Sequence, residues 1–373
     1  MADHCGTSIR RCGYNQPPFS GQTQRMNPFP TLGGLLEQAN ARYAVFDLGR
    51  RVVRISQSRF RRIERGEIPY PLPLQQQAWL GILFWDRAKP EQHFVWFLRF
   101  PLDELGGLQA AARDEFLESV LRALGNPQGT PRNIQELQQE SPYAFKPREE
   151  RLAAFHAKAL AELKQPPSRY CDHARAYLAG TLGYDQWAFV GLQGLADMAA
   201  RLGDPGHSEC VAAAIPHLPL EPLSRLCQLL ENEPLPSTIG VQLCARLLGT
   251  LACEKASIAE ISALVRAIGN TCRGDVRHRM ITAALESRWG AEADLLVAIA
   301  GRAWEALEDE VLRLRYLEAL AGSTAGGELF PMVMRDLLFV PGMRALLLES
   351  FRNPARSPDL AAAIGALMQG VGG

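Results

Sequence analysis

Arginine is concentrated between residues 42 and 65, where eight arginines stand against only Asp47 and Glu64. A guanidinium group forms paired hydrogen bonds with phosphate or carboxylate groups, so the cluster could bind nucleic acid or an acidic protein segment. The candidates for such a surface are Arg50, Arg51, Arg54, Arg59 and Arg62. Because no aromatic-stacking motif of RNA-binding proteins accompanies them, we prefer a solvated face that pairs with nearby acids.

A second candidate is the stretch "IPYPLPLQQQAWLGILFW", residues 68–85. Its proline spacing permits a short polyproline II segment, and Tyr70, Gln75, Gln76 and Gln77 offer a hydroxyl and three amides for a ligand. Proline cannot donate to a strand ladder, so the same prolines also suit a rigid approach to the apolar strand that follows. We favour the structural interpretation over ligand contact.

The motif "DLG" at residues 47–49 resembles the phosphate loops of actin-type ATPases, in which a turn of backbone N–H groups binds anions. That fold needs a second such loop beside a strand. The other match, "DPG" at residues 204–206, lies between two predicted helices, and Arg50 and Arg51 replace small residues that would admit phosphate. A structural hairpin turn is therefore expected, with no nucleotide cofactor.

Metal and catalytic signatures are weak throughout the sequence. Cys171, Asp172 and His173 form the closest cluster, but residues two apart on a helix face different directions. We find no nucleophile elbow, Walker loop, dinucleotide fingerprint or zinc-protease motif. The sequence thus assigns no metal ligand, cofactor or catalytic residue, although carboxylate sites can lack any local motif.

Composition narrows the setting of the protein. The 373 residues carry 40 Lys and Arg against 40 Asp and Glu, so no global field would attract nucleic acid or a membrane. Eight scattered cysteines indicate reduced thiols, and no apolar stretch reaches the length of a membrane-spanning helix. These features predict a cytoplasmic protein with no membrane partner.

The elements that would position these residues divide into two regions. Residues 1–25 are polar and aperiodic, which predicts a disordered leader; Met26 offers a later translation start, in which case the leader is not native. Residues 26–125 predict an α+β domain with a small, mainly antiparallel sheet: a hairpin in "YAVFDLGRRVVRIS", strands "AWLGILFWD" and "QHFVWFLRFPL", and covering helices in "TLGGLLEQAN", "SRFRRIERG" and "ELGGLQAAARDEFLESVLRALG".

A Pro- and Gln-rich linker is expected at residues 126–147, followed by an all-α region at 148–373. Its helices are amphipathic and recur in pairs about every 31 to 40 residues, the range of helix-pair solenoids. Their apolar stripes need a neighbouring helix to be buried. The sequence therefore predicts a HEAT-like array, with a globular helical bundle as the alternative.

Four stretches carry a family resemblance: "VFDLGRRVVRIS", "IPYPLPLQQQAWLGILFW", "HFVWFLRFPLDELGGLQAAARDEFL" and "SPYAFKPREERLAAFHAKALAELK". The chain from about Met26 to its end resembles a gammaproteobacterial family catalogued as domain of unknown function 3549. The resemblance implies a bacterial origin, cytoplasmic residence and a domain that begins near Met26. It implies no activity, ligand or catalytic residue.

Three functions follow as hypotheses. The first is a non-enzymatic interaction or scaffold protein whose curved array binds a protein partner on its concave surface. The second is a nucleic-acid-associated protein that uses the arginines between residues 42 and 65. The third is an enzyme with its pocket at the junction of the two regions, where clefts often form.

Overall fold

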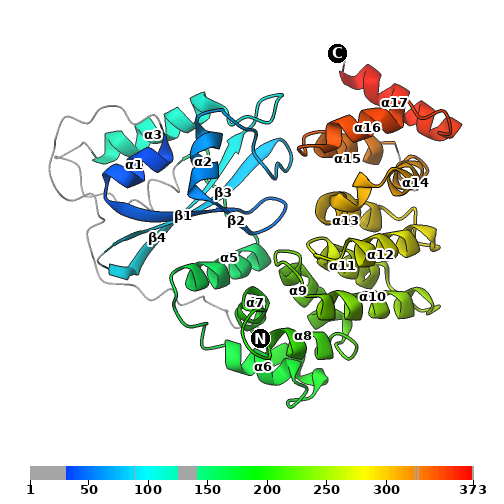
Figure 1. The fold of residues 1–373 in the computed structure, drawn as a ribbon, viewed down its shortest axis with the longest axis horizontal. Coiled ribbons are helices and arrows are strands. Elements are labelled where there is room, and N and C mark those ends of the chain that lie inside the picture. Colours follow the sequence, from blue (N-terminus) through cyan, green and yellow to red (C-terminus); the bar gives the residue numbers. More distant parts are fainter. Residues whose placement is uncertain (1–30, 88, 125–140, 324, 326, 372–373) are drawn as a thin grey trace, which may run out of the picture.

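The computed structural model describes residues 31–87, 89–124, 141–323, 325 and 327–371. The expected leader, and the expected linker as far as residue 140, lie outside the described residues. A small sheet with covering helices comes first, and an arc of helices follows it (Figure 1). The predicted order, a mainly antiparallel α+β region and then helices, is confirmed.

The sheet has four strands in the order β2-β1-β3-β4, and every neighbouring pair is antiparallel. The strands are β1 (Ala41–Asp47), β2 (Val53–Ile55), β3 (Gln77–Asp86) and β4 (Lys89–Pro101). Across the centre, Val45 pairs with Ile82 and Ile82 pairs with Trp96, so β-branched and aromatic side chains stack on one face.

Three helices cover that face of the sheet, and α5 lies on the opposite face (Figure 1). The covering helices are α1 (Leu32–Gln38), α2 (Gln57–Glu64) and α3 (Ala110–Leu124). The Thr31 side chain caps α1 by accepting the N–H of Gly34 at 3.0 Å, and Ser56 caps α2 in the same way. Residues around Phe60, Trp96 and Phe116 form the core between these helices and the sheet.

The helix α3 begins later than the sequence indicates. "ELGGLQ", residues 104–109, was expected to be helical, but Asp103 Oδ1 accepts the N–H groups of Leu105 (2.9 Å) and Gly107 (2.7 Å). Gly106 has a φ of +79°, which glycine adopts without a steric cost. The side chain of Asp103 therefore closes a loop and delays the helix until Ala110.

The remaining helices run from residue 149 to residue 371. They are α5 (Glu149–Glu162), α6 (Cys171–Leu178), α7 (Leu192–Ala200), α8 (His207–Ala214), α9 (Leu220–Leu230), α10 (Ser237–Leu251), α11 (Ile258–Ile268), α12 (Gly274–Glu286), α13 (Ala293–Arg302), α14 (Glu310–Ala321), α15 (Leu329–Leu337), α16 (Met343–Phe351) and α17 (Pro358–Val371), with 3-10 turns η1 (Tyr184–Phe189) and η2 (Trp304–Glu308). One expected helix, residues 186–202, is instead split into η1 and α7, because extended backbone at Gly191 separates them.

These helices form two layers (Figure 1). The odd-numbered helices from α5 to α17 contact one another in succession, and the even-numbered helices from α6 to α16 do the same. The odd-numbered helices from α5 to α15 form the inner layer, which faces the sheet (Figure 1). Each layer buries the apolar stripe of the other, as Leu243 and Leu247 of α10 illustrate. None of the described helices is long and apolar enough to cross a membrane.

Candidate functional site

The loop between β1 and β2, residues 47–52, is here called the arginine hairpin. Its turn is built by Asp47, whose Oδ1 accepts the N–H groups of Gly49 at 3.0 Å and Arg51 at 3.4 Å. Leu48 donates its N–H to the carbonyl of Trp79 at 2.8 Å. These bonds fix the loop so that it projects from the sheet toward the inner layer of helices (Figure 1).

The side chain of Arg50 is fully buried between the sheet region and two helix ends. Its Nε donates to the carbonyl of Pro73 at 2.7 Å, and its Nη1 donates to the carbonyl of Ala300, in the last turn of α13, at 3.0 Å. Its Nη2 binds the carbonyl and the carboxylate of Asp336, near the end of α15, at 3.2 and 2.5 Å. The last carbonyls of a helix lack intrahelical donors and carry negative partial charge, so they suit a guanidinium group.

Arg51 binds the segment that follows α13. Its two terminal nitrogens bind the two carboxylate oxygens of Glu305 at 2.6 and 2.9 Å, and Nη2 also donates to the carbonyl of Arg302 at 2.8 Å. The guanidinium carbon of Arg51 lies 4.2 Å from the ring centroid of Trp304, and that of Arg50 lies 5.2 Å from it. A bidentate ion pair and a cation–π contact therefore act on the same arginine.

Behind the hairpin, one carboxylate binds three arginines. Glu231, which caps the C-terminal end of α9, accepts from Arg302 at 2.8 Å, Arg266 at 2.9 Å and Arg151 at 3.2 Å. Burial acts to raise the pKa of Glu231, but the three positive charges outweigh it and hold that pKa below its usual value. Burial and repulsion by Arg302 lower the pKa of Arg151 to about 9.

The end of α9 also binds the hairpin backbone. Val52 donates its N–H to Asn232 Oδ1 at 2.7 Å, while Asn232 Nδ2 donates to the carbonyl of Leu229 at 3.1 Å. Lys158 bridges the carbonyl of Asn232 at 3.0 Å and the carboxylate of Glu233 at 2.7 Å. The hairpin thus contacts the ends of α9, α13 and α15 at once.

Asp47 is the one carboxylate inside the hairpin itself. Its Oδ2 accepts a hydrogen bond from the hydroxyl of Tyr70, whose side chain is buried. Burial raises the pKa of Asp47 to about 7, although the hydrogen bonds and the charge of Arg151 act in the opposite direction. Since its donors belong to the turn and to Tyr70, this carboxyl organises the hairpin.

The structure separates the sequence-predicted arginines into two groups. Arg50 and Arg51 are buried and bind carboxylates of the chain, and Arg54 pairs with Glu162 of α5 at 2.7 Å. Arg59 and Arg62 are exposed on α2, away from the hairpin contacts. Arg62 lies 3.4 Å from the carboxylate of Glu67.

The glutamines of the "QQQ" stretch lie at a tight turn. Gln75 and Gln76 are exposed and have φ angles of +53° and +58°, and Gln77 begins β3. The N–H of Gln75 donates to Asp336 Oδ1 at 2.9 Å, so the turn shares a partner with Arg50. The structure therefore brings Gln75 to the carboxylate that also binds Arg50. It brings Tyr70 to the arginine hairpin through the hydrogen bond to Asp47.

Sequence reasoning missed the residues that receive the hairpin. They are Arg151, Glu231, Asn232, Trp304, Glu305 and Asp336. Asn232 lies 180 residues from Val52, and Asp336 lies 286 residues from Arg50. The one local signal was "ENEP", residues 231–234, where polar residues follow a helix and could have been assigned as its cap.

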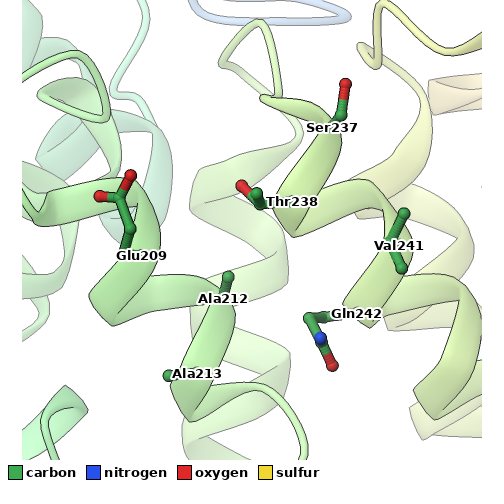
Figure 2. A pocket seen from close by; sticks show the side chains of 7 residues that line it. All are labelled: Glu209, Ala212, Ala213, Ser237, Thr238, Val241 and Gln242. Atoms are coloured by element: carbon green, nitrogen blue, oxygen red, sulfur yellow. The ribbon is translucent and has the colours of Figure 1, made fainter.

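A separate surface feature lies on the outer layer, where α8 and α10 run beside each other (Figure 2). It is a shallow groove of about 460 Å³. Its lining residues are Glu209, Ala212, Ala213, Ser237, Thr238, Val241 and Gln242. Val241 is 49% exposed, so an apolar side chain meets water at the groove wall.

The positions of the His, Cys, Asp and Glu side chains show whether they could bind a metal ion. Within the ranges that the structure describes, no group of three or more His, Cys, Asp or Glu residues could hold a metal ion. Cys171 is buried at the start of α6, whereas His173 is exposed. The two side chains therefore have different environments, as their spacing on a helix predicts.

The fold and these contacts define a class of protein, a small antiparallel α+β unit bound through an arginine hairpin to an arc of layered helices. The chain belongs to the family described as "Protein of unknown function (DUF3549)", whose model matches residues 27–368. The resemblance drawn from the four sequence stretches is thereby confirmed. No curated protein and no solved structure matches the chain.

Proposed function

We propose that the protein is a non-enzymatic interaction or scaffold protein of the bacterial cytoplasm, built on a HEAT-like array. In this proposal the inner layer of helices holds the sheet region, and the outer layer binds a protein partner at the groove between α8 and α10. The succession of neighbour contacts within each layer supports the solenoid assignment. The described cysteines are free thiols, as a reducing compartment favours.

The observation that carries this proposal is the binding of the arginine hairpin by the array. Helix ends at Ala300, Arg302 and Asp336 bind a protein segment through carbonyl and carboxylate oxygens. The same contacts weaken the enzyme hypothesis, because Arg50 and Arg51 bind the carboxylates of Asp336 and Glu305 within the chain and these groups are not free to bind a substrate. They act as an interface, and we assign no catalytic residue to them.

The hairpin occupies part of the concave surface, so the proposal moves the partner to the outer layer. The α8–α10 groove has two small side chains, Ala212 and Ala213, on its α8 side, and Val241 lies on its α10 side. An apolar side chain of a partner fits between them, while Glu209 and Gln242 can hydrogen-bond the partner backbone.

Site-specific photocrosslinking in cells of the native bacterium tests the proposal. A benzoylphenylalanine in place of the exposed Thr238 should give a discrete adduct with one protein, and the same probe at the exposed Glu118 of α3 should not. Ala213→Arg fills the groove and should reduce the adduct about tenfold or more, since it blocks the buried anchor of an interface. Ala245→Arg adds the same charge to an exposed alanine of α10 outside the groove lining and should leave the adduct intact.

Two results would count against the proposal. The first is the absence of any adduct at Thr238 under conditions where the protein is folded. The second is an adduct that Ala213→Arg and Ala245→Arg affect equally.

A further inference from the structure

Besides the hydrogen bond from Val52 to Asn232 at the end of α9, the array is attached to the sheet region by two kinds of contact. At its beginning, Phe155 of α5 is fully buried and packs edge-on against Phe46 and Phe97 of the sheet, with ring centroids 5.4 and 5.2 Å apart. Gly81 of β3 makes room for this ring, since a Cβ there would lie 2.9 Å from Phe155. This first attachment is an apolar, closely packed contact.

The second attachment joins the sheet region to α13, η2 and α15. It consists of the hydrogen bonds and ion pairs of Arg50, Arg51 and Gln75, together with the stacking of both arginines on Trp304. We call these bonds the hairpin contact. Charged groups that separate from one another regain their hydration, so such a contact adds much less net stability than its short distances suggest.

Water reaches the hairpin contact from the array side. The side chains of Asp336 and Glu305 are each 21% exposed, whereas that of Glu231, farther inside, is 2% exposed. Within the hairpin contact, the pairs made by Asp336 and Glu305 are therefore open to competition from solvent and salt.

The turn that meets Asp336 is also strained. Gln75 and Gln76 both have positive φ angles, a conformation that hairpin turns usually give to Asn or Gly. Asp336 accepts the N–H of Gln75 while its other oxygen binds Arg50, so one carboxylate holds both the strained turn and the hairpin. Loss of this carboxylate would release two attachments together.

We propose that the hairpin contact is a reversible conformational switch, in which Asp336 holds the end of the array against the sheet and its release lets α13 to α17 move away. The apolar contact at Phe155 remains closed during this movement. Because each helix pair of a layered array contacts mainly its neighbours, the far end can move without unfolding the rest. In the open state the ends of α13 and α15 are exposed to solvent.

Pulsed electron–electron distance measurements on the full chain test this switch. Spin labels are attached through unnatural amino acids in place of the exposed Glu118 of α3 and Met368 of α17, so the native cysteines stay unlabelled. Asp336→Lys should raise the fraction of molecules at a longer distance about tenfold or more, since the loss of the charge-assisted hydrogen bond from Arg50 alone changes an equilibrium by this order. Glu328→Lys, an equal charge change at the exposed N-terminal end of α15, should leave the distances unchanged.

A salt titration of the unsubstituted chain keeps the switch testable if Asp336→Lys does not fold. Raising salt from about 0.1 M to about 1 M shortens the Debye length from about 10 to about 3 Å and should increase the longer-distance fraction. Asp336→Asn should shift this transition to lower salt. Unchanged distances in folded Asp336→Lys, or in both the unsubstituted chain and Asp336→Asn across the titration, would overturn the switch. The measurement needs no partner, so its outcome is independent of the groove between α8 and α10.

Discussion

Two pairs of arginines, Arg50 with Arg51 and Arg59 with Arg62, stand close together in the sequence and have opposite environments. The first pair is buried in the hairpin contact, where helix ends and carboxylates bind it. The second pair is exposed on α2, on the face of the sheet that the array does not cover. A dense arginine segment need not form one surface, because a hairpin and the helix after it can point to opposite sides of a sheet.

The largest expected difference between the pairs is in stability. Arg50→Ala leaves the carbonyl oxygens of Pro73 and Ala300 without this donor, and Asp336 keeps only the N–H of Gln75. The free energy of unfolding should fall by about 3–5 kcal/mol. Arg59→Ala, an exposed change on α2, should stay within about 0.5 kcal/mol of the unsubstituted chain. Urea denaturation followed by circular dichroism measures both. Equal losses in the two variants would remove the distinction.

The carboxyl group inside the hairpin should give the contact a pH dependence. Because the folded pKa of Asp47, about 7, lies above the unfolded value of 3.8, its stabilising contribution is complete below about pH 3.8 and is lost as the pH rises through about 7. Between pH 5 and pH 6, the unfolding free energy should therefore fall relative to that of Asp47→Asn by about 1.4 kcal/mol, and the slope should level off as the pH passes 7. Urea midpoints of the two chains across this range test it, and parallel curves would show that Asp47 does not titrate there.

An ion pair at the hairpin and an exposed ion pair of α9 provide a smaller contrast. Glu305→Gln removes the charge that binds Arg51 through two oxygens and should cost about 1–2 kcal/mol. Glu221→Gln breaks the exposed pair with Arg225 one turn along α9 and should cost about 0.3–0.5 kcal/mol. Thermal and urea unfolding rank the two, and a larger loss for Glu221→Gln would contradict the assignment.

A substitution in the turn at Gln75 and Gln76 should have an effect of the opposite sign. Gln76→Gly places glycine where φ is +58° and should raise the free energy of unfolding by about 0.5–1 kcal/mol. Gln242→Gly, inside α10, should lower it by about 1 kcal/mol, because glycine is unfavourable within a helix. A loss of stability in Gln76→Gly would mean that the turn is not strained.

Local patterns predicted much of the fold because their causes are local. Thr31 caps α1 as its position before an apolar run predicts, and the "DLG" turn joins two strands as expected of a hairpin. The predicted start of α3 was wrong because a single side chain, Asp103, competes with the helix for backbone N–H groups. The layered stacking followed from apolar stripes, while its HEAT-like character stays a prediction.

The partners of the hairpin could not be predicted because no periodic or spacing rule links them to it. Arg50 and Arg59 are the same residue type, and nothing in the sequence around them distinguishes their partners. Arg50 binds the carboxylate of Asp336 only because α15 lies next to the hairpin in the fold. Predicting Asp336 as that partner would require the relative placement of every helix from α5 to α15. A long-range contact of this kind depends on the sum of many small packing angles.

The separation of Arg50 and Asp336 in the sequence affects when the hairpin contact can form during synthesis of the chain. At about 5–20 residues per second, the 286 residues between them separate their appearance at the ribosome by roughly 15–60 s. During most of that interval, until Glu305 is synthesised, the hairpin is complete but its arginines have neither Asp336 nor Glu305 to bind. Its pairing therefore reports that the array has been made as far as α15, so a nascent chain can acquire its final shape only after α15 has been synthesised.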